Sequence, residues 1–367
     1  MKFTVQREQL LRPLQLVTGV VERRQTLPVL ANLLVKATEN GLEFTGTDLE
    51  VELVAQCEAA VAQPGEATIP ARKLADIWRS LAEGAEVTVA VEGERAVVRS
   101  GRSRFALATL PAADFPKVPG GDADVSLEVG TGDLSKLIDS VSFAMAQQDV
   151  RYFLNGMLLE MAPEHVRTVA TDGHRLAMST LEGTGSDSDT RRQAIVPRKG
   201  VMELARLLDG ESETVQLQLG ANHLTVSTGA YTMTTKLVDG QFPDYEKVIP
   251  ADASRSLEGD RHTLRQAFQR AAILSNEKYR GVRLTIDPDQ LTIQANNPEQ
   301  EEAEEVVPVE FQGNQLEIGF NVSYLLDVLS VLETDGVRLS VSDANSSALI
   351  EGAGEDRSLY VVMPMRL

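Results

Sequence analysis

The sequence predicts an α+β protein made of three similar domains, and two observations support this prediction. First, apolar residues spaced i, i+3, i+4, i+7, as on one face of an α-helix, recur at the same relative places along the chain. One such stripe lies at 74–81, 201–208 and 325–332, and an earlier one at 10–17, 134–141 and 264–271. A period of roughly 125 residues corresponds to a whole domain and not to a solenoid repeat. Second, each stripe is followed by short alternating runs separated by glycine-containing turns, which are typical of antiparallel hairpins.

The first repeat reads as helix, strands, helix, strands. Its helices are predicted at 7–25 and 71–82. Its strands are predicted at 33–37, 42–46, 51–56, 87–91 and 95–99, with another after Gly101. Pro70 suits a helix start, where a missing N–H costs nothing. Pro13 lies inside the first predicted helix, so that helix either starts late or is kinked.

The second and third repeats copy this order. Helices are predicted at 133–147, 197–209, 261–275 and 321–333. Strands are predicted at 156–161, 166–170, 214–219, 223–228, 282–286, 291–295, 305–310, 337–342, 347–351 and 358–362. We expect linkers near 117–128 and 247–260 and an exposed loop at 183–190. The predicted domains are 1–122, 128–248 and 249–367. Many antiparallel strands with two helices per repeat favour sheets that each pack one face on the helices.

The composition is that of an ordinary globular protein. The chain has 367 residues, 43% of them apolar and only 5% aromatic, so the cores must consist mainly of aliphatic side chains. The first seven residues contain no apolar signal core, and no window approaches the ~18 apolar residues of a membrane span. Cys57 is the single cysteine, which excludes an intrachain disulfide and favours a reducing cytoplasm.

The formal charge of −19 argues at first against nucleic-acid binding. Its distribution weakens that objection, because the six predicted helices carry a net +5 and the rest of the chain −24. One interpretation is a basic face formed by helices; the other is scatter over short windows. The helices at 133–147 and 321–333 are net negative and do not fit the pattern.

Several motifs are specific enough to suggest a family. They include Thr45-Gly46-Thr47-Asp48-Leu49-Glu50, Gly101-Arg102-Ser103-Arg104-Phe105, Gln148-Asp149-Val150-Arg151-Tyr152, Ala170-Thr171-Asp172-Gly173-His174-Arg175-Leu176, Asn296-Asn297-Pro298-Glu299-Gln300-Glu301-Glu302 and Val361-Val362-Met363-Pro364-Met365-Arg366-Leu367. In this order, from first residue to last, the chain resembles the bacterial DNA polymerase III beta subunit family of sliding clamps. The resemblance implies a head-to-tail homodimer that closes into a six-domain ring around duplex DNA. The sheets would lie outside, and two helices per domain would line a channel.

Such a ring is physically reasonable. Twelve helices with axes ~8–10 Å apart form a circle roughly 32–38 Å across. After subtraction of about 10 Å for helix thickness, the hole is at least ~22 Å wide, and a duplex of roughly 20 Å fits loosely. A weakly basic lining would touch phosphates without reading bases, so the ring could slide.

By resemblance, one set of residues faces the DNA. The set is Arg24, Arg72, Gln148, Arg151, Tyr152, Phe153, Arg198 and Lys199. The alternative is that the basic members are ordinary surface residues near helix starts. Many family members carry Tyr where this chain has Phe153, so a hydroxyl contact is not available there.

A second set matches the subunit interface of the family, where the first domain meets the third. The set is Lys73, Arg95, Arg99, Arg102, Arg104, Phe105, Leu107, Ile273, Leu274, Glu299, Glu301, Glu302, Glu304 and Glu305. Opposite charges at the two ends of one chain suit head-to-tail closure. The alternatives are a solvated face or a charged edge strand for the acidic run, and core packing for the apolar members.

A third set matches the family's pocket for linear peptides of its partners. The set is Leu154, Thr171, Gly173, His174, Arg175, Leu176, Pro243, Lys247, Val248, Ser347, Val361, Met363, Pro364, Met365 and Arg366. Methionines near the chain end are typical of adaptable binding surfaces. The alternative is a C-terminal strand packed into the third domain. Lys247 replaces the Arg of some relatives, which keeps the charge but loses a planar bidentate contact.

The partners implied by the resemblance are the replicative DNA polymerase alpha subunit, the clamp loader, translesion polymerases, mismatch repair proteins and initiation regulators, at the nucleoid or replisome. No zinc spacing, P-loop, dinucleotide fingerprint or nucleophile elbow is present, so we predict no cofactor and no catalysis. Two other classes remain open. One is an enzyme with a site around Asp172 and His174, and the other is a scaffold that binds proteins but not DNA.

Overall fold

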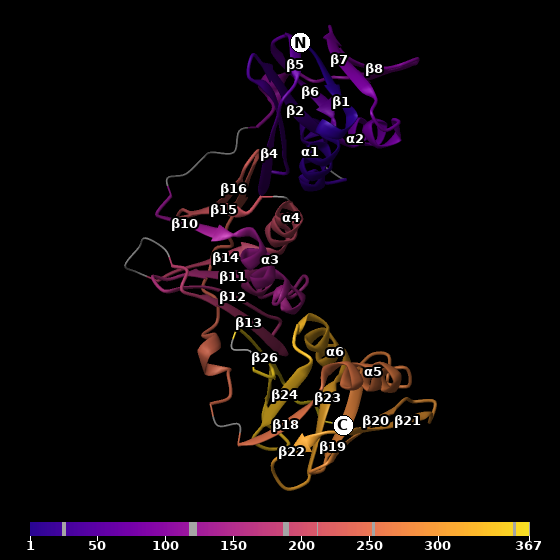
Figure 1. Ribbon diagram of the computed structural model, residues 1–367, viewed down its shortest axis with the longest axis vertical. Helices are drawn as coiled ribbons and strands as arrows, with labels where there is room; N and C mark the ends of the chain where they lie inside the picture. The colour runs from indigo at the N-terminus through magenta and orange to yellow at the C-terminus, as the bar shows by residue number, and fades with distance from the viewer. Residues whose placement is uncertain are drawn as a thin grey trace. The chain divides into compact units, whose positions relative to one another are not determined.

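The computed structural model describes residues 1–23, 27–116, 123–185, 191–210, 212–251, 254–354 and 357–366. The chain divides into two compact units, and Figure 1 labels their helices and strands. Unit 1 comprises Met1–Ser135 and Val196–Leu237, and unit 2 comprises Lys136–Ile195 and Val238–Leu367. The division runs through the middle repeat, so each unit holds one terminal repeat and about half of the middle one.

Unit 1 contains helices α1 (Arg7–Val20), α2 (Ala71–Ser80) and α4 (Arg198–Leu208) and two antiparallel sheets. The five-stranded sheet has the order β5 (Ala60–Gln63), β1 (Lys2–Gln6), β7 (Glu86–Glu92), β8 (Arg95–Ser100), β9 (Ser103–Ala108). The eight-stranded sheet has the order β10 (Val125–Gly130), β15 (Thr214–Leu219), β16 (His223–Thr228), β17 (Tyr231–Lys236), β4 (Val51–Cys57), β3 (Gly41–Thr47), β2 (Asn32–Thr38), β6 (Gly65–Pro70). Short 3-10 turns lie at Pro28–Ala31 and Ala112–Asp114.

Unit 2 contains helices α5 (Arg261–Ala272) and α6 (Val322–Val331), and α3 (Thr131–Asp139) crosses the division between the units. Its nine-stranded sheet has the order β14 (Arg192–Pro197), β11 (Gly156–Met161), β12 (His165–Thr171), β13 (Arg175–Glu182), β26 (Ser358–Val362), β25 (Ala348–Gly352), β24 (Gly336–Val341), β18 (Arg255–Asp260), β22 (Glu310–Phe311). The four-stranded sheet has the order β21 (Glu302–Pro308), β20 (Gln290–Asn296), β19 (Gly281–Ile286), β23 (Leu316–Asn321). Three 3-10 turns, η3 (Ser142–Ala144), η4 (Tyr152–Leu154) and η5 (Tyr245–Lys247), complete the unit.

Each large sheet joins strands of two consecutive repeats. In unit 1, β17 pairs with β4 and sets Met233 opposite Leu53, both fully buried. In unit 2, β13 pairs with β26 and sets Leu176 opposite Val361, also buried. Because a one-residue slip would turn these apolar side chains to the other face, burial fixes the register of both junctions.

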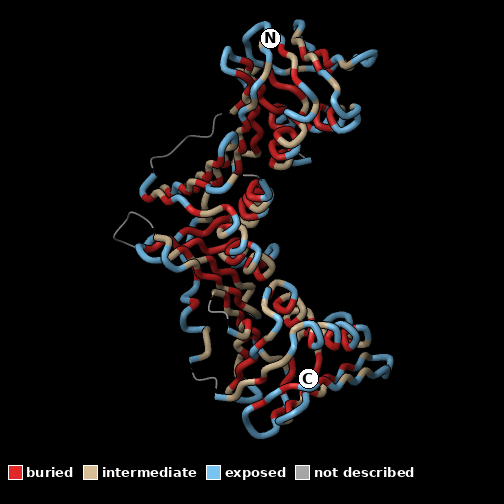
Figure 2. Tube along the Cα trace, in the orientation of Figure 1, coloured by how far each residue is buried: buried red, intermediate tan, exposed pale blue. Residues whose placement is uncertain are grey.

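The helices pack their apolar stripes on the sheets, and the buried positions follow the predicted spacing (Figure 2). In unit 1 a reciprocal pair of hydrogen bonds joins α1 to α2. The indole Nε1 of Trp78 donates to the Arg7 carbonyl at 3.0 Å, and Arg7 Nε donates to the Trp78 carbonyl at 3.2 Å. In unit 2, side chains cap both helices, since Asp260 accepts from the Thr263 amide and Asn321 from the Ser323 amide.

All six predicted helices are confirmed, and two of them end well before the predicted residue. The first ends at Val20 instead of residue 25, and the third ends at Asp139 instead of 147, where the 3-10 turn η3 follows. Pro13 lies inside α1, which begins at Arg7, so a late start was wrong. The proline is buried, and this apolar contact offsets the lost backbone hydrogen bond.

The predicted linkers near 117–128 and 247–260 were partly wrong. β10 begins at Val125 and β18 occupies Arg255–Asp260, and each is paired along its length with a neighbouring strand. Residues 117–122, 252–253 and 186–190 of the predicted loop at 183–190 lie outside the described residues. Strands of six residues that follow glycine-rich or polar segments give too few alternations to be recognised without their partners. In the described part of the chain, no helix has the length and apolarity to cross a membrane.

Candidate functional site

A tight turn between β12 and β13 in unit 2 carries the centre of the predicted peptide pocket. Thr171 Oγ1 donates to the Arg175 carbonyl at 2.6 Å, and the Gly173 amide donates to Thr171 Oγ1 at 3.1 Å. Asp172 Oδ1 accepts from the amides of His174 and Arg175 at 2.9 and 3.1 Å. Gly173 adopts a φ of 87°, which only glycine adopts at little cost. The turn is therefore rigid and presents His174 to solvent.

Arg175 is held from all sides. Its guanidinium donates to Asp172 at 3.2 Å and to the Phe143 carbonyl at 2.9 Å, and it pairs with Asp327 of α6. It also lies 5.1 Å from the ring centre of Phe143 and 4.6 Å from that of Tyr324. The rings of His174 and Tyr324 stack with centres 6.4 Å apart. Arg175 thus links the turn to Phe143 and to α6, and these contacts hold its guanidinium in one position.

The sequence did not identify Phe143, Tyr324 or Asp327 as part of this site. Burial raises the pKa of the Tyr324 hydroxyl. Tyr324 and Asp327 lie three residues apart on α6, so they share one helix face. That pairing of an aromatic and an acid on an otherwise apolar helix was the available signal.

An apolar cluster lies beneath the turn. It comprises Leu158, Val169, Leu176, Ile195, Phe242, Tyr245 and Val361, with Phe153, Met178, Val238, Ile249, Leu349 and Leu359 packed against it. The members come from β11, β12, β13, β14, β25, β26, the 3-10 turn η4 and the segment around η5. Leu176 and Val361 were predicted as pocket residues, but their side chains are buried and form part of the core beneath the surface.

Beyond β26, two backbone hydrogen bonds hold the chain end in place. The Met363 amide donates to the His174 carbonyl, and the Met365 amide donates to the Gly319 carbonyl, both at 2.9 Å. Met363 is 40% exposed, whereas Pro364 and Met365 are half-buried. The expected C-terminal strand is present as β26, and the tail beyond it leaves one methionine accessible.

Pro243, Lys247 and Val248 surround buried Tyr245 at η5 and are exposed. Lys247 pairs with Asp244 at 2.7 Å, and this hydrogen bond raises the pKa of the Lys247 ammonium. Leu154 is buried and Ser347, just before β25, is half-buried, while Arg366 is exposed. All of the residues predicted for the peptide pocket lie in unit 2.

The side chains of Asp172 and His174 each contact other groups. Asp172 accepts from two backbone amides and from Arg175, and His174 packs on Tyr324. Among the described residues no cluster of His, Cys, Asp or Glu side chains has the arrangement of a metal site. These contacts fit a structural turn that carries a binding surface.

The predicted DNA-facing residues divide between the units, and Arg24 lies outside the described residues. In unit 2, Gln148 adopts a φ of 56°, and Arg151 is paired with Asp149 at 2.9 Å. Arg151 also holds the pKa of the Asp149 carboxyl at about 2. Tyr152 is 56% exposed and meets Phe153 edge-on at 5.9 Å, while Phe153 packs on the apolar cluster. Tyr152 is therefore the accessible ring of the two.

In unit 1, Arg72 and Lys199 occupy the first turns of α2 and α4. Arg72 is exposed and donates to the Val21 carbonyl at 3.0 Å. Lys199 Nζ lies 3.0 Å from the Val20 carbonyl and 3.1 Å from Glu22 and also pairs with Asp48. Arg198 is half-buried. Lys199 thus joins α4 to the end of α1 and to the β3–β4 turn.

Most of the predicted subunit-interface residues lie on or beside the outer strands of the smaller sheets, and the others lie on α2 or just after α5. β9, with Arg104, Phe105 and Leu107, is an edge strand in unit 1, next to β8 with Arg95 and Arg99; Arg102 lies in the turn between these two strands. β21, with Glu302, Glu304 and Glu305, is an edge strand in unit 2, and Glu299 and Glu301 precede it. Lys73 is exposed on α2, and Leu274 is half-buried after α5. The acidic run is therefore a charged edge strand, as one of the alternatives predicted.

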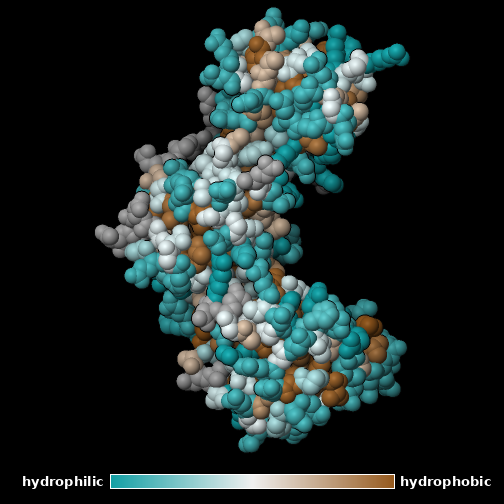
Figure 3. All heavy atoms as spheres, viewed as in Figure 1, coloured by the Kyte–Doolittle hydropathy of each residue, from teal (hydrophilic) through white to brown (hydrophobic). Residues whose placement is uncertain are grey.

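Two features distinguish the β21 edge. Ile273, at the end of α5, is 76% exposed and Val306 on β21 is 55% exposed, and apolar atoms are visible on this part of unit 2 amid a mostly hydrophilic surface (Figure 3). Glu305 is already paired with Arg270 through hydrogen bonds of 2.7 and 2.6 Å, which lower the pKa of its carboxyl. Ile273 is accordingly the large apolar side chain that stands out here.

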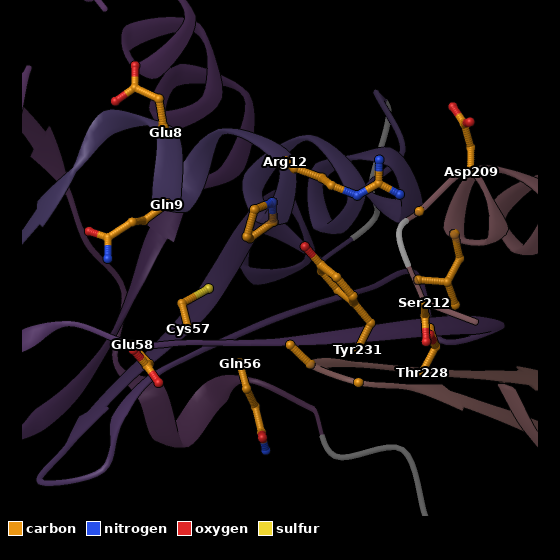
Figure 4. A pocket seen from close by; sticks show the side chains of 15 residues that line it. Glu8, Gln9, Arg12, Gln56, Cys57, Glu58, Asp209, Ser212, Thr228 and Tyr231 are labelled. Atoms are coloured by element: carbon orange, nitrogen blue, oxygen red, sulfur yellow. The ribbon is translucent and has the colours of Figure 1, made fainter. Parts of the chain in front are cut away.

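A large cavity in unit 1, of about 870 Å³, lies apart from these three sets. Figure 4 shows Arg12 from α1 and Tyr231 from β17 reaching into the same space, with Cys57 at the end of β4. Burial raises the pKa of the Cys57 thiol to about 11. A protonated thiol and a mixture of acids and one arginine do not define a particular ligand.

Comparisons with known proteins agree with this architecture. Three family profiles match in order: DNA polymerase III beta subunit, N-terminal domain, over residues 1–119, the central domain over 128–244, and the C-terminal domain over 246–366. Among curated proteins, the beta sliding clamp of Pseudomonas putida is 57% identical and that of Escherichia coli 52% identical, each covering 100% of both chains. A crystal structure of the Pseudomonas aeruginosa sliding clamp bound to griselimycin matches with a TM-score of 0.97 at 58% identity over 100% of both chains. The Caulobacter crescentus pol III beta structure matches with a TM-score of 0.94 at 38% identity, again over 100% of both chains.

The chain has three similar domains, and its large sheets pair strands of consecutive domains. Together with the matches over the whole length, this architecture defines a protein of the sliding-clamp class. The chain belongs to the DNA polymerase III beta subunit family, the beta sliding clamps of bacteria.

Proposed function

We propose that this chain is a non-catalytic processivity factor of DNA replication. Two copies assemble head to tail into a ring that encloses duplex DNA, and partner proteins bind to it through the surface around His174 and Met363. The single observation that carries the proposal is the match to beta sliding clamps over the full length of both chains. The rigid turn at Thr171–Arg175 and the fastened chain end support the location of the binding surface.

The finer parts of the proposal follow from the same resemblance. The domains are 1–122, 128–248 and 249–367, and the ranges of the three family profiles support these limits. The chain faces the DNA through Arg72 and Arg198 on the helices α2 and α4, through Gln148 in the loop between η3 and η4, and through neighbouring residues, without reading the sequence of the DNA. The partners are the replicative polymerase alpha subunit, the clamp loader, translesion polymerases, mismatch repair proteins and initiation regulators, in the cytoplasm. The bound griselimycin of the Pseudomonas aeruginosa clamp supports the presence of a ligand surface on such a ring.

Topological retention tests the proposal. We expect protein loaded by an ATP-driven clamp loader onto nicked circular DNA to remain bound at high salt and to be lost after the circle is cut once. The physical reason is that encirclement needs no affinity, whereas phosphate contacts weaken steeply with salt. Gel filtration of labelled protein on DNA, before and after cleavage, measures this directly.

The alternatives predict different results. An ordinary DNA-binding protein is retained equally on the circular and the linear form at any given salt concentration, and a scaffold that binds only proteins does not load at all. Either result, obtained with an active loader and a control clamp from Escherichia coli, would contradict the proposal.

A further inference from the structure

A buried carboxylate lies close to the proposed peptide surface and has no place in the functions described above. The side chain of Glu160, on β11, is completely buried. Its Oε2 accepts hydrogen bonds from Arg191 Nε at 2.6 Å, Gln193 Nε2 at 2.7 Å and the Tyr245 hydroxyl at 3.2 Å. Its Oε1 lies 2.9 Å from His165 Nε2 and 3.6 Å from Arg167 Nη1. We refer to these six side chains as the Glu160 cluster.

The cluster keeps a charge inside the protein. Burial by itself would raise the pKa of the Glu160 carboxyl, but hydrogen bonds from Gln193, His165 and Arg191 together lower it. A buried carboxylate with fewer partners would be costly, and removal of one partner of such a group is far more damaging than loss of an exposed ion pair. Because so many donors surround the buried Glu160 carboxylate, we conclude that its charge has a structural role.

Tyr245 connects the cluster to the peptide surface. Its hydroxyl donates to Glu160 and accepts from Arg167 Nη1 at 3.1 Å and from Arg191 Nη2 at 3.0 Å. Its ring is only 3% exposed and packs in the apolar cluster that contains Leu176 and Val361. The other five members lie on or beside β11, β12 and β14 of one sheet, whereas Tyr245 belongs to η5, outside that sheet.

We infer that Glu160 is a positioning residue for partner binding, because it fixes the Tyr245 hydroxyl and through it the segment 242–248. This segment carries the exposed Pro243, Lys247 and Val248. If this segment is already ordered before a peptide binds, it loses less conformational freedom on binding, and the affinity for the peptide is higher. The inference rests on the proposed function, since it assumes that the surface binds peptides.

Griselimycin is a suitable probe because a clamp 58% identical to this chain binds it. Glu160→Gln keeps the shape of the side chain and removes its charge, and we expect about tenfold weaker binding by calorimetry, or roughly 1.4 kcal/mol. Tyr245→Phe removes only the linking hydroxyl, and we expect binding weakened about fivefold. The double variant should bind no worse than Glu160→Gln alone, because both changes break the same connection.

Two further measurements separate positioning from general stability. In both single variants, hydrogen exchange should accelerate at the amides of 244–248, including Val248, which donates to the Tyr245 carbonyl at 3.0 Å, and stay slow in β12. The matched control is Glu258→Gln, which removes an exposed ion pair with Arg338 on the same sheet and should leave binding unchanged.

Unchanged griselimycin affinity in folded Tyr245→Phe protein would overturn the inference, even if Glu160→Gln failed to fold. Additive losses in the double variant would overturn it as well. If the unmodified chain did not bind griselimycin, the proposed peptide surface itself would be refuted, and the inference with it.

Discussion

At the scale of single residues, the same hydrogen-bonded turn occurs twice in the chain, with a different residue in its left-handed position. Thr47 and Asp48 repeat the hydrogen bonds of Thr171 and Asp172. Thr47 Oγ1 donates to the Val51 carbonyl at 2.9 Å and accepts from the Leu49 amide at 3.0 Å, while Asp48 accepts from the amides of Glu50 and Val51. The residue in the left-handed conformation is Leu49 in the first copy, with a φ of 78°, and Gly173 in the second, with a φ of 87°.

That single difference decides what the two turns present. A leucine rarely adopts a positive φ, and the strain is offset here by packing on a cluster of Val29, Leu30, Leu34 and Phe115. At Gly173 the turn has no side chain of its own, and the Arg151 guanidinium lies over the glycine, since an added Cβ would be 3.0 Å from two of its nitrogens. The first copy is therefore covered by its own leucine, and the second by an arginine from a neighbouring segment.

The thiol of Cys57 gives a prediction on pH. Burial raises its pKa from 9.0 to about 11, so the folded state keeps the thiol protonated while the unfolded chain already loses its proton. The unfolded state therefore binds fewer protons between pH 9 and 11. We expect stability from this group to be complete below about pH 9 and to fall as the pH rises through 11.

The same shift predicts slow chemical modification. At pH 8 the native thiol should react about 100-fold more slowly with a disulfide reagent than in the urea-unfolded chain, because the thiolate is the reactive form. Release of the reagent's chromophore measures both rates. Equal rates in the two states would show that the thiol is not shielded.

At the scale of elements, the junction of α4 with α1 gives a prediction on stability. Lys199 neutralises Asp48, whose side chain is only 5% exposed. Lys199→Gln should lower the free energy of unfolding by about 1–3 kcal/mol, because a buried carboxylate loses its counter-charge. Urea denaturation followed by circular dichroism provides the measurement.

Arg79→Gln is the matched control for this change. Arg79 makes an exposed ion pair with Asp76 one helical turn away on α2, a type worth only about 0.3–0.5 kcal/mol. Equal losses for Lys199→Gln and Arg79→Gln would show that Lys199 does not hold the junction. Because Lys199 is already engaged, its effect on DNA binding has to be measured in protein whose stability is known.

At the scale of the whole molecule, Ile273 gives a prediction on assembly. Ile273 is 76% exposed and lies next to an edge strand, so other residues of the single chain leave this apolar side chain largely in contact with solvent. Burial of such a side chain contributes about 1.5–3 kcal/mol, so Ile273→Asp should weaken the homodimer by at least roughly tenfold. Sedimentation velocity over a dilution series measures the dissociation constant.

Val150→Asp is the control for assembly, since Val150 is 95% exposed but lies outside the predicted interface. An Ile273→Asp protein that remains a dimer with unchanged affinity would contradict the assignment of this edge to the ring contact. Charge at the edges is expected to set the register, because exposed ion pairs contribute only about 0–1 kcal/mol each.

The distribution of charge also belongs to the whole molecule. With the observed ends, the six helices of the described chain carry a net +6 within a protein of net charge −19. A basic set of helices within an acidic protein suits weak, salt-sensitive contacts with phosphates. Retention by encirclement makes strong contacts unnecessary, which is consistent with the proposed function.

The sequence by itself determined the number of repeats, the six helices and most of the hairpins. Periodic burial repeats at 3.6 residues in a helix and 2 in a strand, and glycine turns mark the ends, so these features are local and visible in one chain. The motifs around Thr171–Leu176 and Val361–Arg366 indicated a binding surface, and the structure brings the two segments together through the pairing of β13 with β26.

Only the tertiary structure decided how the strands join and which charges are free. β10 and β18 were hidden in segments that resemble linkers, because a short strand is stable only when its backbone groups are paired with a neighbour. Nothing local indicates that Lys199 pairs with Asp48, or that Glu160 meets Arg191 and Tyr245, since these partners are distant in sequence. The energy of a buried charge depends on every group around it, and those groups are brought together only when the chain has folded.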